Sequence, residues 1–171
     1  VTGDDPGKAR WYSIETDNFK VIYPEGADSL AREYAAKIER YRIPVSLTTG
    51  YASGDGDGRK MPVVMHAYNA ANGSVAWAPK RMDLFTVPSP YSTEPMPWPT
   101  MLSVHEGRHV TQMQFGMTGN QRPFGYAFGQ MWNILVSLVY PGLYGIEGDA
   151  VIAETALTQS GRGRTADFLN Y

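Results

Sequence analysis

The sequence predicts an α+β fold in which a small mixed β-sheet, in the N-terminal half, packs on a helical half. Two observations carry this prediction. Short apolar runs typical of strands occur before residue 88, whereas residues after 98 recur at the three- and four-residue steps of helices. We therefore expect a β-rich part, about 11–90, and a helical part, about 98–171, with a cleft between them.

Length and composition indicate one domain, residues 1–171. Of the 171 residues, 43% are hydrophobic and 19% are charged, which suffices for a buried core. The net charge of −2 offers no basic surface for nucleic acid. Cysteine is absent, which excludes a disulfide scaffold and a thiolate metal site. The longest apolar run, 131–146, is broken by polar residues and a Pro-Gly pair, so we expect no transmembrane segment.

Two strands and a helix are predicted at the start of the chain. Residues 13–23 form two extended pieces around a turn, and alternate residues of the second piece share one face. Asp28 or Ser29 is expected to cap the helix. This helix must end before Pro44, since proline disfavours helical backbone in the residue that precedes it.

A loop rich in Gly and Asp, residues 50–60, leads into the next strands. Asp55 and Asp57 match the opening of a calcium-binding loop, but the glutamate expected at its twelfth position is missing. A solvated loop is therefore the favoured interpretation, with calcium as the alternative. The strands that follow are predicted at 61–67, 74–78 and 82–87.

The helical half is predicted to contain three helices, the first of them capped by Thr100. The second, 131–140, is expected to be buried and to end at Pro141, with a membrane-touching surface as the alternative. Residues 116–129 form an insertion that could make the rim of a cleft. The third helix is predicted at 147–158, and a flexible basic turn at 161–164.

The first of these helices carries the pattern His105-Glu106-Gly107-Arg108-His109. Positions i and i+4 lie on the same face of a helix, so both imidazoles can face one Zn²⁺ ion while Glu106 projects beside them. The alternative is that both histidines are ordinary polar residues of a buried helix.

A zinc site of this kind needs a third protein ligand. The acidic candidates after the motif are Glu147, Asp149, Glu154 and Asp167. The simplest arrangement packs the 147–158 helix on the motif helix, with Glu147 at its N-terminal end reaching the metal. A glutamate that only stabilises the helix dipole explains Glu147 equally well by itself.

These residues resemble the gluzincin metallopeptidases, in which an H-E-x-x-H helix is followed by an E-G-x-A-x-x-x-E helix. The resemblance implies a zincin-like fold with one Zn²⁺ per chain held by His105, His109 and Glu147, and Glu106 as general base. It implies a supporting role for Glu154. The interval from His109 to Glu147 (147 − 109 = 38) is similar to that of gluzincin-like domains of exported bacterial proteins that continue into a TolB-like β-propeller.

The resemblance implies a zinc metallopeptidase, an endopeptidase, that acts on a peptide or protein substrate. An edge strand would hold the substrate backbone, through Gly73, Ser74, Val75, Ala76 and Trp77. The alternative is an edge strand that Pro79, Lys80 and Arg81 protect against aggregation. Glu154 and Asp149 are candidates for orienting the histidines.

The resemblance further suggests an extracytoplasmic location and a C-terminal β-propeller in the parent protein. The chain is then expected to be truncated at its C-terminus, and the group that stabilises the oxyanion could lie beyond residue 171. Two other functions stay open: a zinc-binding interaction module with little activity, and a helical domain with a chance motif.

Overall fold

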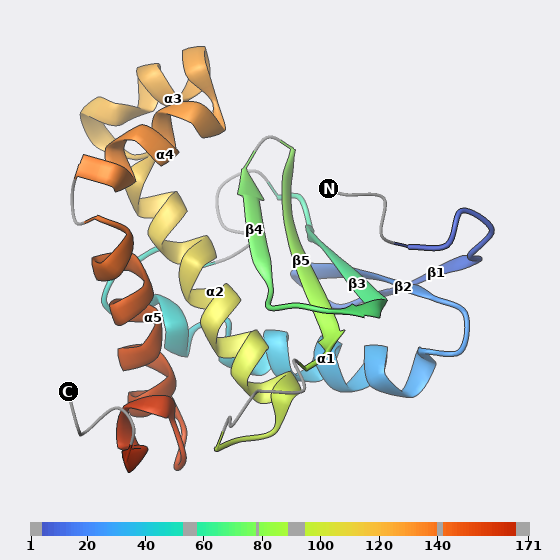
Figure 1. Ribbon diagram of the computed structural model, residues 1–171. Coiled ribbons are helices and arrows are strands. Elements are labelled where there is room, and N and C mark those ends of the chain that lie inside the picture. The colour runs from blue at the N-terminus through green and yellow to red at the C-terminus, as the bar shows by residue number, and fades with distance from the viewer. Residues whose placement is uncertain (1–4, 53–57, 78, 89–94, 140–141, 167–171) are drawn as a thin grey trace.

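A five-stranded mixed sheet and the helices packed on it make up this computed structural model, which confirms the predicted α+β class (Figure 1). The structure describes the chain except for 1–4, 53–57, 78, 89–94, 140–141 and 167–171. Several predictions concern residues outside the described part. They are the candidate calcium ligands Asp55 and Asp57, the acidic candidate Asp167, and the last residues of two predicted elements, Ala78 and Tyr140.

The strands follow the order β1-β2-β3-β5-β4, so β4 lies at an edge of the sheet. β2 pairs parallel with β3, and β3 with β5, while β1 and β4 are antiparallel to their neighbours. The strands are β1 (Trp11–Glu15), β2 (Phe19–Pro24), β3 (Met61–Ala70), β4 (Ser74–Trp77) and β5 (Lys80–Val87). The mixed sheet agrees with the prediction, although β3 runs three residues further than expected.

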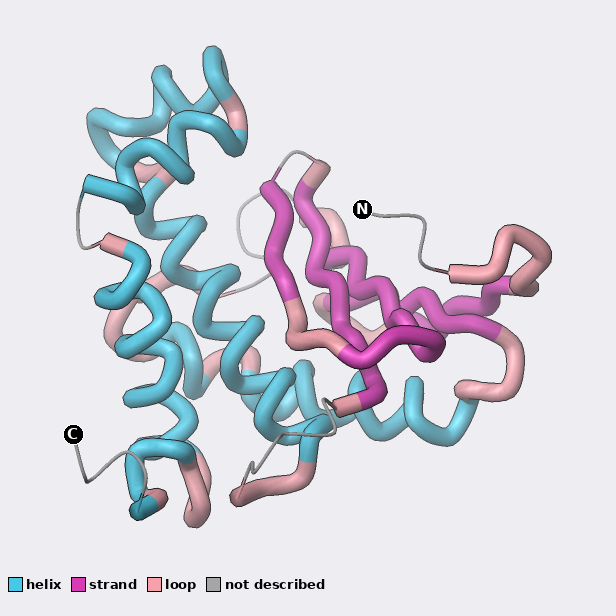
Figure 2. Tube along the Cα trace, in the orientation of Figure 1, coloured by secondary structure: helices cyan, strands magenta, loops and turns pink. Residues whose placement is uncertain are grey.

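One face of this sheet forms the core with α1 (Asp28–Tyr41) and α2 (Trp98–Gly116). The two-residue period of the strands places alternate side chains on this face, among them Phe19 and Val21 of β2 and Val63 of β3. Tyr34 and Ile38 of α1 meet them at helical spacing. Figure 2 shows the resulting division between strands and helices.

The predicted helix starts were wrong at α1 and α2. α1 has Ala27 at its N-cap, and neither Asp28 nor Ser29 caps it. α2 begins at Trp98, so Thr100 already lies inside the helix. Proline is tolerated in the first turn because its missing N–H would have no partner there anyway, which explains why Pro99 did not delay the start.

α2 is the central helix of the molecule: Figure 1 shows it between the edge strand β4 and α5 (Leu143–Leu157). α5 starts four residues earlier than predicted, after Gly142. Glu147 is therefore in its second turn, where the helix-dipole explanation loses force because that effect is confined to the first turn.

The segment between α2 and α5 folds into α3 (Arg122–Phe128) and α4 (Gln130–Val139) at the C-terminal end of α2 (Figure 1). The prediction that α4 is buried was wrong, because Leu135, Leu138 and Val139 are exposed. Across the described residues, no single helix is long and apolar enough to cross a membrane, although α4 and α5 together, bent by 90°, meet the length and composition criteria.

Three short 3-10 segments complete the described chain: η1 (Pro44–Ser46), η2 (Gly119–Gln121) and η3 (Arg162–Arg164). η3 covers the last three residues of the Gly-Arg-Gly-Arg sequence, 161–164, that we expected to be a flexible turn. It instead packs on α5, where the Gly163 N–H donates to the Thr155 hydroxyl at 3.0 Å.

Candidate metal centre

Two histidines from successive turns of α2 face each other. The Nε2 atoms of His105 and His109 lie 3.1 Å apart, and their ring planes are at 89°. Both side chains are almost completely covered, because α2 is packed between the sheet and α5. The four-residue spacing of the motif thus directs two imidazole nitrogens at one point, as predicted.

Glu147 of α5 supplies the third donor. Its Oε2 lies 3.2 Å from Nε2 of His105, and its Oε1 lies 3.4 Å from Nε2 of His109. One ligand atom from each of the three residues falls within 4.8 Å of the other two. The structure therefore brings together the three residues that the sequence assigned to zinc.

The separations among these atoms suit a Zn²⁺ ion. Tetrahedral zinc with ligand bonds of about 2.0–2.1 Å has neighbouring donor atoms about 3.3 Å apart. The 3.1 Å between the two Nε2 atoms is close to that value, and each Nε2 has a different oxygen of Glu147 nearby, at 3.2 Å for His105 and 3.4 Å for His109. Two neutral imidazoles and one carboxylate, which leave a fourth position open, are also the donor types of catalytic zinc sites.

The charge on Glu147 fits this role. Its hydrogen bond with His109 is the main cause that lowers the pKa of Glu147 to about 2, against the opposing effect of burial. The carboxylate is therefore ionised at neutral pH, the state in which it can bind a cation.

A buried carboxylate orients His105. Nδ1 of His105 lies 2.6 Å from Oε1 of Glu154, whose side chain is completely buried. Arg162 of η3 donates to the same carboxylate from Nε at 2.8 Å and from Nη2 at 2.5 Å. Burial acts to raise the pKa of Glu154, but the hydrogen bonds from His105 and Arg162 outweigh it and lower the pKa. With its Nδ1–H donated to Glu154, His105 presents Nε2 to the metal position.

A longer chain of contacts orients His109. Its Nδ1 lies 2.8 Å from Oε1 of Gln112, and Nε2 of Gln112 donates to Oδ2 of Asp149 at 2.5 Å. Asp149 also accepts two hydrogen bonds from Arg108, at 2.6 and 2.9 Å. Glu154 was thus predicted correctly as a partner of a histidine. Asp149 acts through Gln112, one contact further from the ring than predicted.

Glu106 lies beside the three donors, in a buried position on α2. Burial raises the pKa of this carboxyl group, with the nearby imidazoles opposing that effect. Its Oε2 is buried and has no hydrogen-bond partner among the residues that the structure describes. A buried polar oxygen without a partner is costly, so this atom marks a place where a water or a substrate group belongs.

Gly73, just before β4, lies directly against Glu106. A Cβ atom at this glycine would stand 2.3 Å from Cγ of Glu106 and 2.5 Å from its Oε1. No other residue type fits this contact without displacing the glutamate. The glycine therefore allows the edge of the sheet to approach the site closely.

The cleft expected between sheet and helices lies at this junction. A pocket of about 340 Å³ is lined by the three candidate ligands and Glu106. Gly73, Ser74 and Val75 line it from the sheet edge. Ala76 and Trp77, predicted to bind substrate as well, are not among its lining residues. They pair with Arg81 and Lys80 of β5 further along β4.

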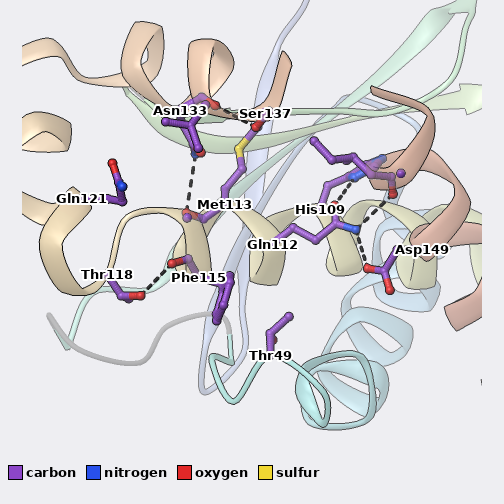
Figure 3. Close-up of a pocket in the computed structure, with 14 residues that line it drawn as sticks. Thr49, His109, Gln112, Met113, Phe115, Thr118, Gln121, Asn133, Ser137 and Asp149 are labelled. Carbon is purple, nitrogen blue, oxygen red and sulfur yellow. Dashed lines mark hydrogen bonds between the residues drawn. The ribbon is translucent and has the colours of Figure 1, made fainter. Parts of the chain in front are cut away.

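A second pocket of about 620 Å³ adjoins the first (Figure 3). His109, Met113, Asn133, Ser137 and Ile146 line both pockets. Asn133 and Ser137 of α4 point inward, and Nδ2 of Asn133 donates to the Met113 carbonyl at 3.5 Å. α4 thus contributes a wall of the cleft. Of the insertion predicted to form the rim, residues 116–129, Gly116, Thr118 and Gln121 line only the second pocket.

A scan against protein-family models, a search of curated proteins and a search of solved structures each return no match for this chain. The resemblance to gluzincins accordingly stays a prediction. A function for this chain therefore has to be inferred from the geometry of the site.

Two residues of this site were missed in the sequence. Gln112 lies one turn after His109 on the same helix face, a spacing from which the contact can be anticipated. Arg162 had no such signal, because it lies 57 positions from His105 and only the packing of η3 on α5 brings it near.

Proposed function

We propose that this chain is a zinc-dependent peptidase domain in which His105, His109 and Glu147 hold Zn²⁺ and Glu106 is the general base. One observation carries the proposal. Three donor atoms converge within 4.8 Å, and the buried Oε2 of Glu106, in the same pocket, lacks a partner among the described residues. A chance motif would require neither feature.

A zinc ion bound there would supply a Lewis acid, which lowers the pKa of water toward neutrality and polarises a peptide carbonyl. The protein's own part begins with orientation. His105 and His109 each give their Nδ1 to a fixed acceptor, which leaves Nε2 of both rings directed at the ion.

Glu106 performs the proton transfer in this proposal. Its Oε2 takes the proton of the attacking water and delivers it to the nitrogen of the leaving amine. A general base works best when its pKa is near the working pH, and burial shifts the pKa of Glu106 in that direction. Gly73 contacts this side chain and limits the positions that its carboxylate can take.

The edge of β4 provides a place for the substrate. It is the last strand in the sheet order, and Ser74 and Val75 line the same pocket as the three candidate ligands. An extended peptide can add to such an edge through backbone hydrogen bonds. The alternative is an edge strand that is followed by Lys80 and Arg81, which protect it against aggregation. It predicts that no peptide binds along this strand.

Metal analysis and a cleavage assay test the proposal. We expect about one zinc per chain in the wild type and in Glu106→Gln, and none in Glu147→Ala. Glu106→Gln should lower cleavage of an unstructured protein by about 10²–10⁴-fold. Glu25→Gln, a change at an exposed turn residue, is the matched control and should alter neither quantity. Folded wild type without zinc would contradict the metal assignment.

A second candidate is a zinc-binding interaction module with little activity. The lining of the metal pocket, within the described part of the chain, contains no tyrosine and no histidine other than the two ligands. In the gluzincins that the sequence resembles, a tyrosine or histidine often supplies this donor to the oxyanion. Bound zinc together with equal, negligible cleavage by wild type and Glu106→Gln would favour this candidate.

A further inference from the structure

On the helix α4, polar side chains face the interior and apolar side chains face outward. Asn133, on its inner face, is 3% exposed, and the Ser137 hydroxyl donates to the Asn133 carbonyl at 2.7 Å. The outer face bears the apolar side chains: Leu135 is 54% exposed, Leu138 55% and Val139 80%. A helix of a water-facing domain normally turns its apolar stripe toward the core. The medium outside α4 should therefore be apolar.

We call this stripe the outer face of α4: Met131, Leu135, Leu138 and Val139. Ile134, 40% exposed, lies at its border and also lines the cleft. The neighbouring helices also carry exposed aromatic residues, namely Phe124, Tyr126 and Phe128 of α3 and Tyr144 of α5. Figure 1 shows that α3 and α4 lie at the end of α2, away from most of the sheet. Exposed apolar residues thus occur on three successive helices, and groups of exposed apolar residues mark interaction sites.

The chemistry of this surface identifies its partner. Residues 123–146 contain no Asp, Glu, Lys, Arg or His. No side chain in the outer face of α4 carries a strong hydrogen-bonding group, whereas protein interfaces have about one hydrogen bond per 100–200 Å². Aromatic residues beside an uncharged aliphatic stripe are typical of segments at a membrane–water interface.

We propose that the outer face of α4, with the adjoining aromatic residues of α3 and α5, binds to the surface of a lipid bilayer. Neutral headgroups suffice, because this surface offers no charge for anionic lipids. The opposite face of α4 lines the cleft through Asn133 and Ser137, so a bound membrane would lie next to the cleft. The inference requires no zinc and is independent of the proposed peptidase activity.

Cosedimentation with phosphatidylcholine vesicles tests this proposal. We expect the wild-type chain to bind, with little change when the salt concentration rises. The double variant Leu135→Ser/Leu138→Ser should bind at least about tenfold more weakly. Each leucine is about half exposed, so the two together offer the bilayer about as much apolar surface as one whole leucine side chain. Leu47→Ser is the matched control, since Leu47 is 73% exposed and lies outside α3, α4 and α5. Protein stripped of metal with a chelator should bind equally well.

A probe at a single cysteine locates the contact. The chain has no cysteine, so Leu138→Cys and Leu47→Cys each accept one environment-sensitive fluorophore. Vesicles should shift the emission of the label at residue 138 to shorter wavelength and leave the label at residue 47 unchanged. Folded wild type that fails to bind, or equal binding by the double variant, would overturn the proposal. A dimer that the double variant dissociates, without vesicle binding, would overturn it in favour of a second copy of the chain.

Discussion

The two histidines of the site are held by different means. His105 rests on a buried ion pair between Glu154 and Arg162, whereas His109 rests on a neutral amide, Gln112. Removing one partner of a buried ion pair leaves an uncompensated charge, which costs about 3–5 kcal/mol. The His105 side of the site is therefore the more sensitive to substitution. The sequence predicted only part of this support for His105, because it identified Glu154 and not Arg162.

Gly73→Ala tests the contact between the sheet edge and Glu106. The added Cβ would collide with Glu106 Cγ at 2.3 Å, so the glutamate or the strand must move. Because 1 Å of misplacement can cost about 10²-fold in rate, we expect cleavage to fall by about that factor while zinc content stays unchanged.

The control for this variant is Gly7→Ala, where an added Cβ meets nothing within 4 Å. It should cleave like the wild type. Wild-type cleavage by Gly73→Ala would show that the contact does not position Glu106.

Among the helices, α2 and α5 contribute all three proposed ligands. η3 packs on α5 and supports His105 through the contact of Arg162 with Glu154. The close packing of η3 depends on Gly161, where a Cβ would stand 2.3 Å from the Thr155 Cα atom. The contact is with backbone, which cannot rotate away as a flexible side chain could. A glycine is thus required for Arg162 to reach Glu154, a role that the sequence alone did not show.

Gly161→Ala should therefore displace η3 and weaken the Arg162–Glu154 pair. We expect the free energy of unfolding to fall by about 1–3 kcal/mol, as for other overpacked sites. Zinc affinity should fall about 10–100-fold through the loss of support for His105. Urea unfolding and competition with a chromophoric chelator measure the two effects.

Gly107→Ala is the counterpart on α2. Its Cβ would lie 3.5 Å from the Val45 Cγ2 atom, an ordinary contact, and alanine favours the helix interior by about 1 kcal/mol. This variant should be as stable as the wild type or more so. If both glycine variants lose equal stability, close packing at Gly161 is not the cause.

At the scale of the whole molecule, His66 of β3 connects the sheet to the start of the chain. Its Nδ1 lies 2.6 Å from Oδ2 of Asp5, and its Nε2 lies 3.1 Å from Oδ1 of Asp83. The hydrogen bond with Asp83 is the main cause that raises the pKa of His66, against the opposing effect of burial. Burial acts to raise the pKa of Asp83, but His66 and Arg81 together lower it.

Stability should consequently depend on pH. The contribution of His66 is complete below its unfolded pKa of about 6.5 and is lost as pH rises through the higher folded value. That of Asp83 is complete above its unfolded pKa of about 3.9 and is lost as pH falls through the lower folded value. We expect the difference in unfolding free energy between wild type and His66→Gln to be largest between about pH 4 and 6.5.

Urea unfolding over a series of pH values, with zinc added throughout, measures that difference. The comparison with the variant removes contributions from His105 and His109, which both proteins share. A difference that does not decline above pH 6.5 would rule out the charged form of His66 as its source.

By itself the sequence determined the fold class, most of the elements and the proposed ligand set. These follow from short-range regularities: a two-residue period for strands, and a four-residue spacing that puts His105 and His109 on one helix face. It located Glu147 and Glu154 as well, through a resemblance that no comparison tested. Helix starts were wrong because the residues at the observed N-caps are Ala27 and Pro97, which precede the polar residues expected to cap these helices.

Tertiary structure alone decided how distant segments meet. The contacts of Arg162 with Glu154 and of Gly73 with Glu106 join residues that no local pattern connects. The outward apolar face of α4 was likewise undetermined, because an amphipathic pattern defines two faces of a helix and leaves open which of them turns inward. Packing of the whole chain makes that choice, and here it turns the polar side of α4 toward the cleft.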